Sequence, residues 1–133
     1  MTIVIKAGEV PLLDRGGGVT TIPLVTHRSD GTAAITTGIS TYPKGTGAPL
    51  HVHNCDEQVT LLEGKGEVEI EGEITPLIPY DSTYIAAGLQ HAFRNTGDEA
   101  MRILWIYPTQ DVTRTLMSTG ETIAHLSDDD LMS

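Results

Sequence analysis

Residues 47–64 read GAPLHVHNCDEQVTLLEG, and positions 51–57 of this stretch contain two histidines, a cysteine and two acids. On a β-strand, residues two apart point to the same face, so His51 and His53 would aim two imidazole rings at one point. Neutral imidazole is the commonest nitrogen ligand, and two such rings on the same face of a strand can chelate one metal ion. The alternative is a solvent-facing polar strand whose histidines bind nothing.

Two further residues extend the pattern. Glu57 offers a carboxylate where the chain turns back into an apolar stretch, and His91 lies in another predicted strand. Three imidazoles and one carboxylate would leave an octahedral metal with two open positions, which is typical of a catalytic rather than a structural site. The residues therefore predict one metal with four ligands: His51, His53, Glu57 and His91.

The surrounding sequence favours short strands. The 14 glycines and 7 prolines of the chain fall between short apolar stretches, and this pattern of turns between short strands is typical of an all-β sandwich or barrel. Glu71 and Gly72 predict a tight hairpin turn. The predicted strands are residues 35–42, 49–53, 58–62, 67–71, 74–78, 83–86, 91–95 and 101–107.

The length of 133 residues predicts one domain, with a core at about 33–107, N-terminal strands within 1–32 and a C-terminal arm at 108–133. Within the arm, residues 110–118 are compatible with either a short helix or an extended segment. The final residues, SDDDLMS, predict an acidic and frayed tail.

Composition excludes several classes of partner. The formal net charge is −10, and no basic stripe exists for nucleic acid or for anionic lipid. No apolar run is long enough to span a bilayer, and the first residues lack the pattern of a signal peptide. A lone Cys55 cannot form an intrachain disulfide. These features predict a cytoplasmic protein whose partners are small molecules or proteins.

The 47–64 stretch resembles the first cupin motif, in which HxH is followed by three residues, a Glu, six residues and a Gly. His51, His53, Glu57 and Gly64 all fall in register. The resemblance implies that the paired histidines and Glu57 are metal ligands.

Residues 86–95, AAGLQHAFRN, resemble the second cupin motif, Pro-x-Gly-x-x-His-x-x-x-Asn, with Gly88, His91 and Asn95 in place. Two departures are Ala86, where the family usually has Pro, and Tyr80-Asp81, where it usually has a Gly. Both departures affect turn geometry rather than ligands, and the resemblance covers roughly residues 33–107.

The resemblance implies a single cupin β-barrel, or double-stranded β-helix (jelly roll), of the RmlC-like cupin superfamily, with the metal near one mouth. It also implies a homodimer. We expect one divalent transition metal per chain, with iron or manganese favoured and nickel or zinc possible.

Aromatic side chains near the motifs are candidates for the pocket wall. Phe93 lies two residues after His91 and so should point to the same face of its strand. For each aromatic residue, the alternative to contact with a ligand is plain packing in the core. The candidates are Phe93, Trp105, Tyr107 and Tyr84, with Tyr42 beside them.

The remaining reactive side chains predict little. Cys55 is an even number of residues from His51, His53 and Glu57, which would place it on their face of a strand. A turn is predicted at residues 54–56, however, so this alternation fails there, and we interpret Cys55 as a thiol that does not bind the metal. His27 and His125 are expected at the surface. Because Arg94 is expected to point outward and other basic residues are scarce, the pocket should suit a small neutral or monoanionic chelating ligand.

Two classes of function fit these features. The first is a metal-dependent enzyme acting on a small chelating molecule, dioxygenase-like first, with isomerase, decarboxylase or lyase chemistry as variants. The second is a non-catalytic, metal-containing module that binds or senses a small molecule. The fold alone does not choose between them.

Overall fold

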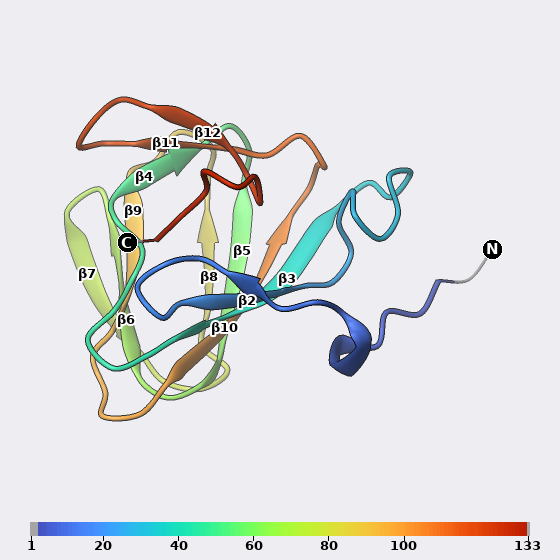
Figure 1. Ribbon diagram of the computed structural model, residues 1–133. Helices are drawn as coiled ribbons and strands as arrows, with labels where there is room; N and C mark the ends of the chain where they lie inside the picture. Colours follow the sequence, from blue (N-terminus) through green and yellow to red (C-terminus); the bar gives the residue numbers. More distant parts are fainter. Residues whose placement is uncertain (1–2, 133) are drawn as a thin grey trace.

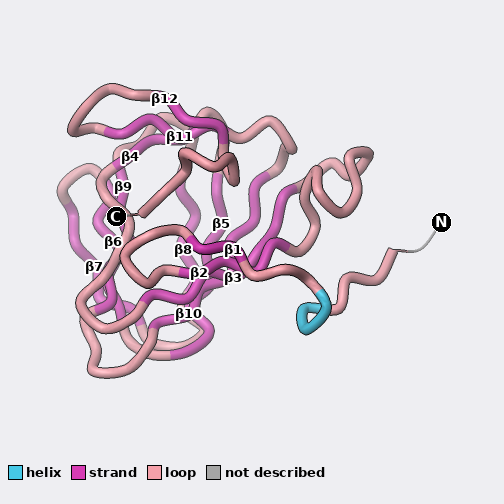
Figure 2. Tube along the Cα trace, viewed as in Figure 1, coloured by secondary structure: helices cyan, strands magenta, loops and turns pink. Residues whose placement is uncertain are grey.

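The computed structural model describes residues 3–132, and these form two antiparallel β-sheets that face each other (Figure 1). The all-β prediction is confirmed, since the described chain contains one 3₁₀ turn, Ala7–Glu9, and otherwise strands and loops (Figure 2). Of the predicted terminal segments, Met1, Thr2 and Ser133 lie outside the described residues. Among residues 3–132, no helix has the length and apolar character needed to cross a bilayer.

The twelve strands divide equally between the sheets. Their bounds are β1 Leu13–Asp14, β2 Thr20–Pro23, β3 Thr36–Tyr42, β4 His51–His53, β5 Glu57–Glu63, β6 Gly66–Ile70, β7 Glu73–Leu77, β8 Ser82–Ile85, β9 His91–Asn95, β10 Met101–Tyr107, β11 Thr113–Leu116 and β12 Thr122–Ala124. One sheet has the order β1-β2-β3-β10-β5-β8 and the other β12-β11-β4-β9-β6-β7.

The core lies between the sheets, and β10 shows how the sequence forms it. Burial alternates along this strand, so Met101, Ile103, Trp105 and Tyr107 are all buried while the residues between them are half-buried. This is the period of two expected of a strand with one face on the core. The side chains of Trp105 and Tyr107 therefore face inward.

The hairpin between β6 and β7 follows its sequence signal. Glu71 and Gly72 have φ values of 48° and 84°, the pair of positive angles that a two-residue turn of the primed type requires. Outside the hairpin, Arg94 of β9 donates to Glu67 at 2.8 Å and to Glu69 at 2.5 Å. Arg94 thus points away from the core, as expected.

The C-terminal residues differ from the prediction. The extended alternative holds for residues 110–118, because β11 pairs with the free edge of β4 and with β12. The prediction of a frayed tail is wrong. Asp130 is fully buried, and the Met132 amide donates to the Arg15 carbonyl at 2.5 Å. The buried partners of Asp130 are distant in sequence, so a local acidic run gave no sign of them.

One close contact in the core gives a test of packing. Gly38 is the cross-strand partner of Trp105, and a Cβ at Gly38 would overlap the indole ring and stand 3.0 Å from the Ile22 carbonyl oxygen. We expect Gly38→Ala to lower the free energy of unfolding by about 1–3 kcal/mol, because overpacking displaces the ring. Urea unfolding followed by Trp105 emission measures this. Gly31→Ala, with open space around its Cβ, should change stability by less than about 0.5 kcal/mol; equal losses would contradict the packing explanation.

Candidate metal centre

The structure brings His51, His53 and His91 together inside the barrel. His51 and His53 come from β4, and His91 of β9 is the cross-strand partner of His51. Their metal-binding atoms all lie within 4.8 Å of one another, and the three side chains are buried. Glu57, the first residue of β5, is also buried and reaches this cluster from the other sheet.

The backbone fixes the orientation of each imidazole ring. The Nδ1 atoms of His51, His53 and His91 lie 2.6, 3.0 and 2.9 Å from backbone carbonyl oxygens. A carbonyl oxygen only accepts, so each Nδ1 carries the hydrogen and donates it. The three carbonyl groups belong to Pro49, Thr113 and Leu89. Each Nε2 atom is thereby turned toward the common centre.

Electrostatics keep two of these rings neutral. Burial lowers the pKa of His51 well below its usual value, and the neighbouring His91 and His53 lower it further. Burial also lowers the pKa of His53, against the opposing effect of Glu57. Both rings are therefore neutral near pH 7, with a bare lone pair on Nε2.

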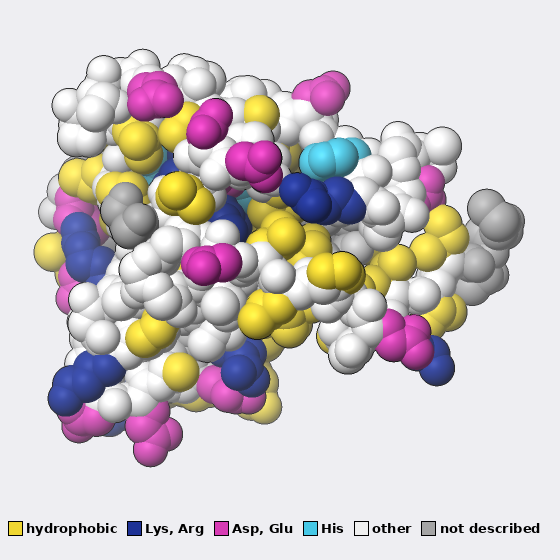
Figure 3. Space-filling view, viewed as in Figure 1, with side chains coloured by type: hydrophobic (Ala, Val, Ile, Leu, Met, Phe, Trp, Pro, Cys, Tyr) yellow, Lys and Arg dark blue, Asp and Glu magenta, His cyan; other side chains and the backbone are white. Residues whose placement is uncertain are grey.

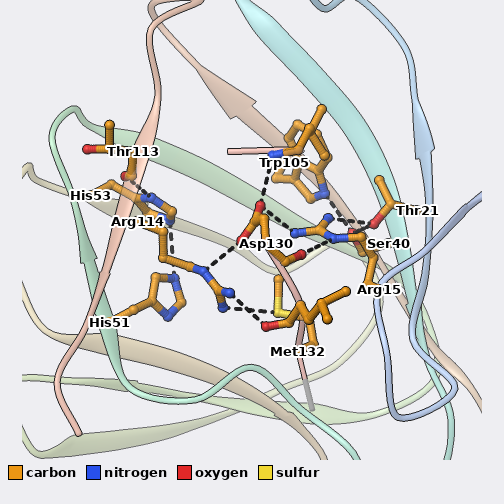
Figure 4. Close-up of polar contacts among 12 residues, drawn as sticks. Arg15, Thr21, Ser40, His51, His53, Trp105, Thr113, Arg114, Asp130 and Met132 are labelled. Carbon is orange, nitrogen blue, oxygen red and sulfur yellow. Dashed lines mark hydrogen bonds and ion pairs between the residues drawn. The ribbon is translucent and has the colours of Figure 1, made fainter. Parts of the chain in front are cut away.

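The Nε2 atoms of His51 and His53 lie only 3.1 Å apart (Figure 4). Two bare lone pairs at this separation repel each other unless a cation lies between them. Cis ligands of an octahedral metal, each bonded at about 2.1 Å, would lie about 3.0 Å apart. The observed separation fits that spacing.

Glu57 completes the donor set. Its Oε1 atom lies 3.1 Å from His91 Nε2 and 3.7 Å from His53 Nε2. Burial raises the pKa of Glu57, but the contacts with the imidazole rings of His91 and His53 outweigh it, so the net pKa is lowered. An ionised carboxylate beside three imidazole nitrogens is a donor set that suits a divalent transition metal.

Tyr107 adds a hydroxyl group to the centre. Its oxygen lies 3.1 Å from His53 Nε2, and since that nitrogen is bare the phenol donates the hydrogen bond. Burial raises the pKa of Tyr107 well above its usual value, and the Glu57 carboxylate adds to the shift. Tyr107 therefore holds its proton at neutral pH, within reach of the predicted ligands.

The side chains around the centre enclose a cavity of about 30 Å³. Three of the four aromatic pocket candidates line it, namely Phe93, Trp105 and Tyr107, and so does Tyr42. The prediction for Tyr84 is wrong: it is 67% exposed and donates to the Asp56 carboxylate outside the barrel. β8 is an edge strand, and Tyr84 lies on its outer face.

Four other residues of the cavity wall were missed or misplaced: Arg15, Arg114, His125 and Met132. His125 was expected at the surface, yet its ring packs 4.9 Å from that of Trp105 and 5.0 Å from that of Tyr107. Burial lowers its pKa well below the usual value. His27, by contrast, is exposed as expected.

The expectation of a pocket with few positive groups is wrong, because the guanidinium groups of Arg15 and Arg114 both line it. On the outer face that Figure 3 shows, Lys and Arg side chains are scattered rather than gathered in a stripe. The acidic net charge of the whole chain therefore does not predict the positive charge of the cavity wall.

Cys55 lies beside the centre without joining it. The thiol is half-buried, and burial raises its pKa to about 11, with Glu57 and Asp56 adding to the effect. A protonated thiol is a poor metal ligand. Among the described residues, the histidine cluster does not include Cys55.

Asn95, the last residue of the second motif, has a structural role. Its side-chain amide donates to the carbonyl oxygens of Tyr42 at 2.9 Å and of Glu99 at 2.8 Å, and it accepts from the Gly97 amide at 2.9 Å. It therefore ties the turn after β9 to β3, away from the histidines.

Comparison with curated proteins finds two informative relatives. The polyketide synthase CurC of Streptomyces cyaneus is 32% identical over 96 residues, which cover 71% of this chain and 61% of CurC. The 5-nitrosalicylic acid 1,2-dioxygenase of a Bradyrhizobium species is 41% identical over 49 residues, which cover 37% of this chain and 24% of that enzyme. The chain thus spans less than two thirds of the length of either relative.

Solved structures share the fold. The polyketide cyclase RemF from Streptomyces resistomycificus superposes with a TM-score of 0.71 at 18% identity, covering 98% of this chain and 90% of RemF. The family model described as Cupin domain matches residues 38–107, which are more than half of the chain and include His51, His53, Glu57 and His91. The two-sheet barrel, the motif residues and this match together show that the chain belongs to the cupin family.

Proposed function

We propose that this chain is a metal-dependent enzyme in which His51, His53, His91 and Glu57 hold one divalent transition metal beside a small chelating substrate. The observation that carries the proposal is the pair of neutral, buried Nε2 atoms 3.1 Å apart. Among the described side chains, Tyr107 donates to His53 Nε2 and none donates to His51 Nε2, so a cation is the partner that would satisfy both nitrogens together. Four ligands leave positions open for substrate.

Each residue of the centre has a distinct part in this proposal. When bound, the metal would supply Lewis acidity and a template for the substrate oxygens. Glu57 provides the negative charge that offsets part of the metal charge. Tyr107 holds a proton on its phenol oxygen, where a substrate oxygen that gains negative charge can receive a hydrogen bond. Phe93 and Trp105 supply apolar surface to the wall of the cavity.

Dioxygenase-like chemistry with iron or manganese is the first candidate reaction. The similarity to 5-nitrosalicylic acid 1,2-dioxygenase supports it, since the substrate in that name is a hydroxy acid whose two oxygen groups can chelate a metal. The two open cis positions would suit one oxygen of such a substrate beside dioxygen, or both oxygens of the substrate with dioxygen reacting from outside the coordination sphere.

Redox-inactive chemistry on an enolisable substrate is the second candidate. The similarity to the polyketide synthase CurC supports it, since polyketides carry ketone groups beside enolisable carbon atoms. Isomerase, decarboxylase and lyase reactions all belong to this group, and zinc or nickel would serve them as well as iron.

Reconstitution with different metals separates these candidates. The metal-free protein is loaded with iron(II), manganese(II) or zinc(II) and mixed with a panel of hydroxy acids, catechols and β-diketones. Oxygen uptake and absorbance are then followed together. We expect uptake of dioxygen with iron or manganese only. Tyr107→Phe, which lacks the phenol proton, should take up dioxygen at about a tenth of the wild-type rate or less. Turnover without oxygen uptake would favour the second candidate, and saturable binding without turnover would show a binding module instead.

A further inference from the structure

Two buried arginines stand next to the candidate metal centre. Arg114 of β11 is the cross-strand partner of His53, and cross-strand partners project their side chains from the same face of a sheet. Arg15 follows β1 on the opposite sheet. Arg114 is 1% exposed and Arg15 is 3% exposed, and both line the cavity that contains His51 and Glu57.

Both arginines are paired with a single carboxylate from the end of the described chain. Arg15 donates to Asp130 Oδ2 at 2.7 Å, and Arg114 Nε lies 2.9 Å from Asp130 Oδ1 (Figure 4). The second contact is an ion pair without a directed hydrogen bond, since Arg114 Nε and Asp130 Oδ1 both lack a hydrogen-bond partner. Asp130 therefore satisfies one arginine well and the other poorly.

Asp130 belongs to residues 126–132, which we name the C-terminal cover. The cover contains no strand, and arginine side chains provide much of its attachment. Arg28 donates to the Leu126 carbonyl at 3.0 Å, Arg114 to the Leu131 carbonyl at 2.7 Å, and Arg15 to the Asp130 carbonyl at 2.9 Å. A segment held largely by side chains opens more readily than one within a sheet.

The cover also limits the size of the cavity. Met132 is part of the cavity wall, and about 30 Å³ is room for a water molecule rather than for an organic substrate. A substrate that reaches the histidines therefore needs part of the wall to move, and the cover contributes Met132 to that wall. Once Asp130 leaves, two buried guanidinium groups lose their counter-charge, which is strongly unfavourable unless another anion replaces it.

We propose that Arg15 and Arg114 form a carboxylate-binding subsite beside the metal centre, occupied in this structure by the chain's own Asp130. The substrate is then a carboxylic acid with a second oxygen that can bind the metal, such as a 2-hydroxy or 2-oxo acid. Its carboxylate replaces that of Asp130, because planar guanidinium groups match carboxylate oxygens. This inference rests on the proposed function for the role of the metal, but the anion subsite itself does not.

Benzoate tests the subsite without any metal, with benzamide as the neutral control of the same shape. Binding to the metal-free chain is measured by Trp105 emission and by calorimetry, in the wild type and in Asp130→Asn. We expect Asp130→Asn to bind benzoate at least about tenfold more tightly than the wild type, since the internal competitor has lost its charge. Arg114→Gln in the Asp130→Asn background should remove the preference of benzoate over benzamide. Equal binding of benzoate and benzamide to Asp130→Asn would overturn the proposal.

Hydrogen exchange of the wild type keeps the test decisive even where Asp130→Asn fails to fold. The Leu126 amide donates to Asp130 Oδ2 at 2.8 Å and the Met132 amide to the Arg15 carbonyl at 2.5 Å. Benzoate at saturating concentration should accelerate exchange at both amides, and benzamide should not. Unchanged exchange with benzoate would show that the cover does not yield to a carboxylate, and the proposal would fail.

A third arm separates this inference from the proposed function. In metal-loaded protein, 2-hydroxybenzoate should bind at least about tenfold more tightly than benzoate, and in metal-free protein the two should bind alike. Benzoate binding without metal uptake would sink the proposed function and leave the anion subsite standing. Metal uptake without discrimination between benzoate and benzamide would overturn the anion subsite and leave the proposed function standing.

Discussion

The protein with both His51→Ala and His53→Ala should retain about a tenth or less of the wild-type metal after reconstitution with iron(II) or manganese(II) and desalting. Two of the four donors are lost, and the remaining His91 and Glu57 lie at 3.1 Å from each other on different sheets. Elemental analysis of the purified proteins gives the result directly. The same loss should remove any metal-dependent turnover.

His27→Ala is the matched control for this experiment, because it removes an imidazole that is exposed and outside the cluster. Its metal content should equal that of the wild type. Stoichiometric metal in the double variant would mean that the ion binds elsewhere, and the assignment of β4 as the centre of the site would have to be abandoned. Circular dichroism of both proteins shows whether the barrel is intact.

Asp130→Ala should lower the free energy of unfolding by about 3–5 kcal/mol. The carboxylate is the shared counter-ion of Arg15 and Arg114, and it also accepts from the Leu126 amide. Its removal leaves two buried cations unpaired and one amide without its acceptor. Urea unfolding of the metal-free protein, followed by Trp105 emission, measures the loss.

Asp129→Ala provides the control, since it changes the net charge equally at an exposed neighbouring position. We expect a change of less than about 0.5 kcal/mol there. Similar losses in both variants would show that the effect comes from the acidic run as a whole. The buried ion pairs would then have no special part in stability.

The fold and the clustering of the three histidines were predictable because both depend on local sequence. Period-two alternation in Met101–Tyr107 determines which side chains face the core, and the spacing of His51 and His53 places both rings on one face. Glycine at the hairpin of Glu71 and Gly72 marks a turn with positive φ. Each of these signals operates between residues that are neighbours in the chain.

The cationic wall of the cavity was not predictable in this way. Arg15 and Asp130 are separated by 115 positions, and neither residue lies in a motif or a periodic pattern. Asp130 is one of three consecutive aspartates, of which the other two are exposed, so composition indicated a solvated tail. Only the return of the chain across the barrel mouth shows which aspartate is buried. The prediction for Tyr84 failed for a related reason, because its position near the motifs does not show that β8 is an edge strand.

The three backbone carbonyls that hold the imidazole rings have a thermodynamic consequence. Because Pro49, Thr113 and Leu89 fix the ring orientations, the rotamer entropy of the histidines is lost when the barrel folds rather than when an ion binds. If the proposed function holds, the centre would act as a rigid chelator, whose selectivity depends on ionic radius and preferred angles as much as on the chemical nature of its donors. Metal uptake would then add to the stability of an already folded chain through mass action.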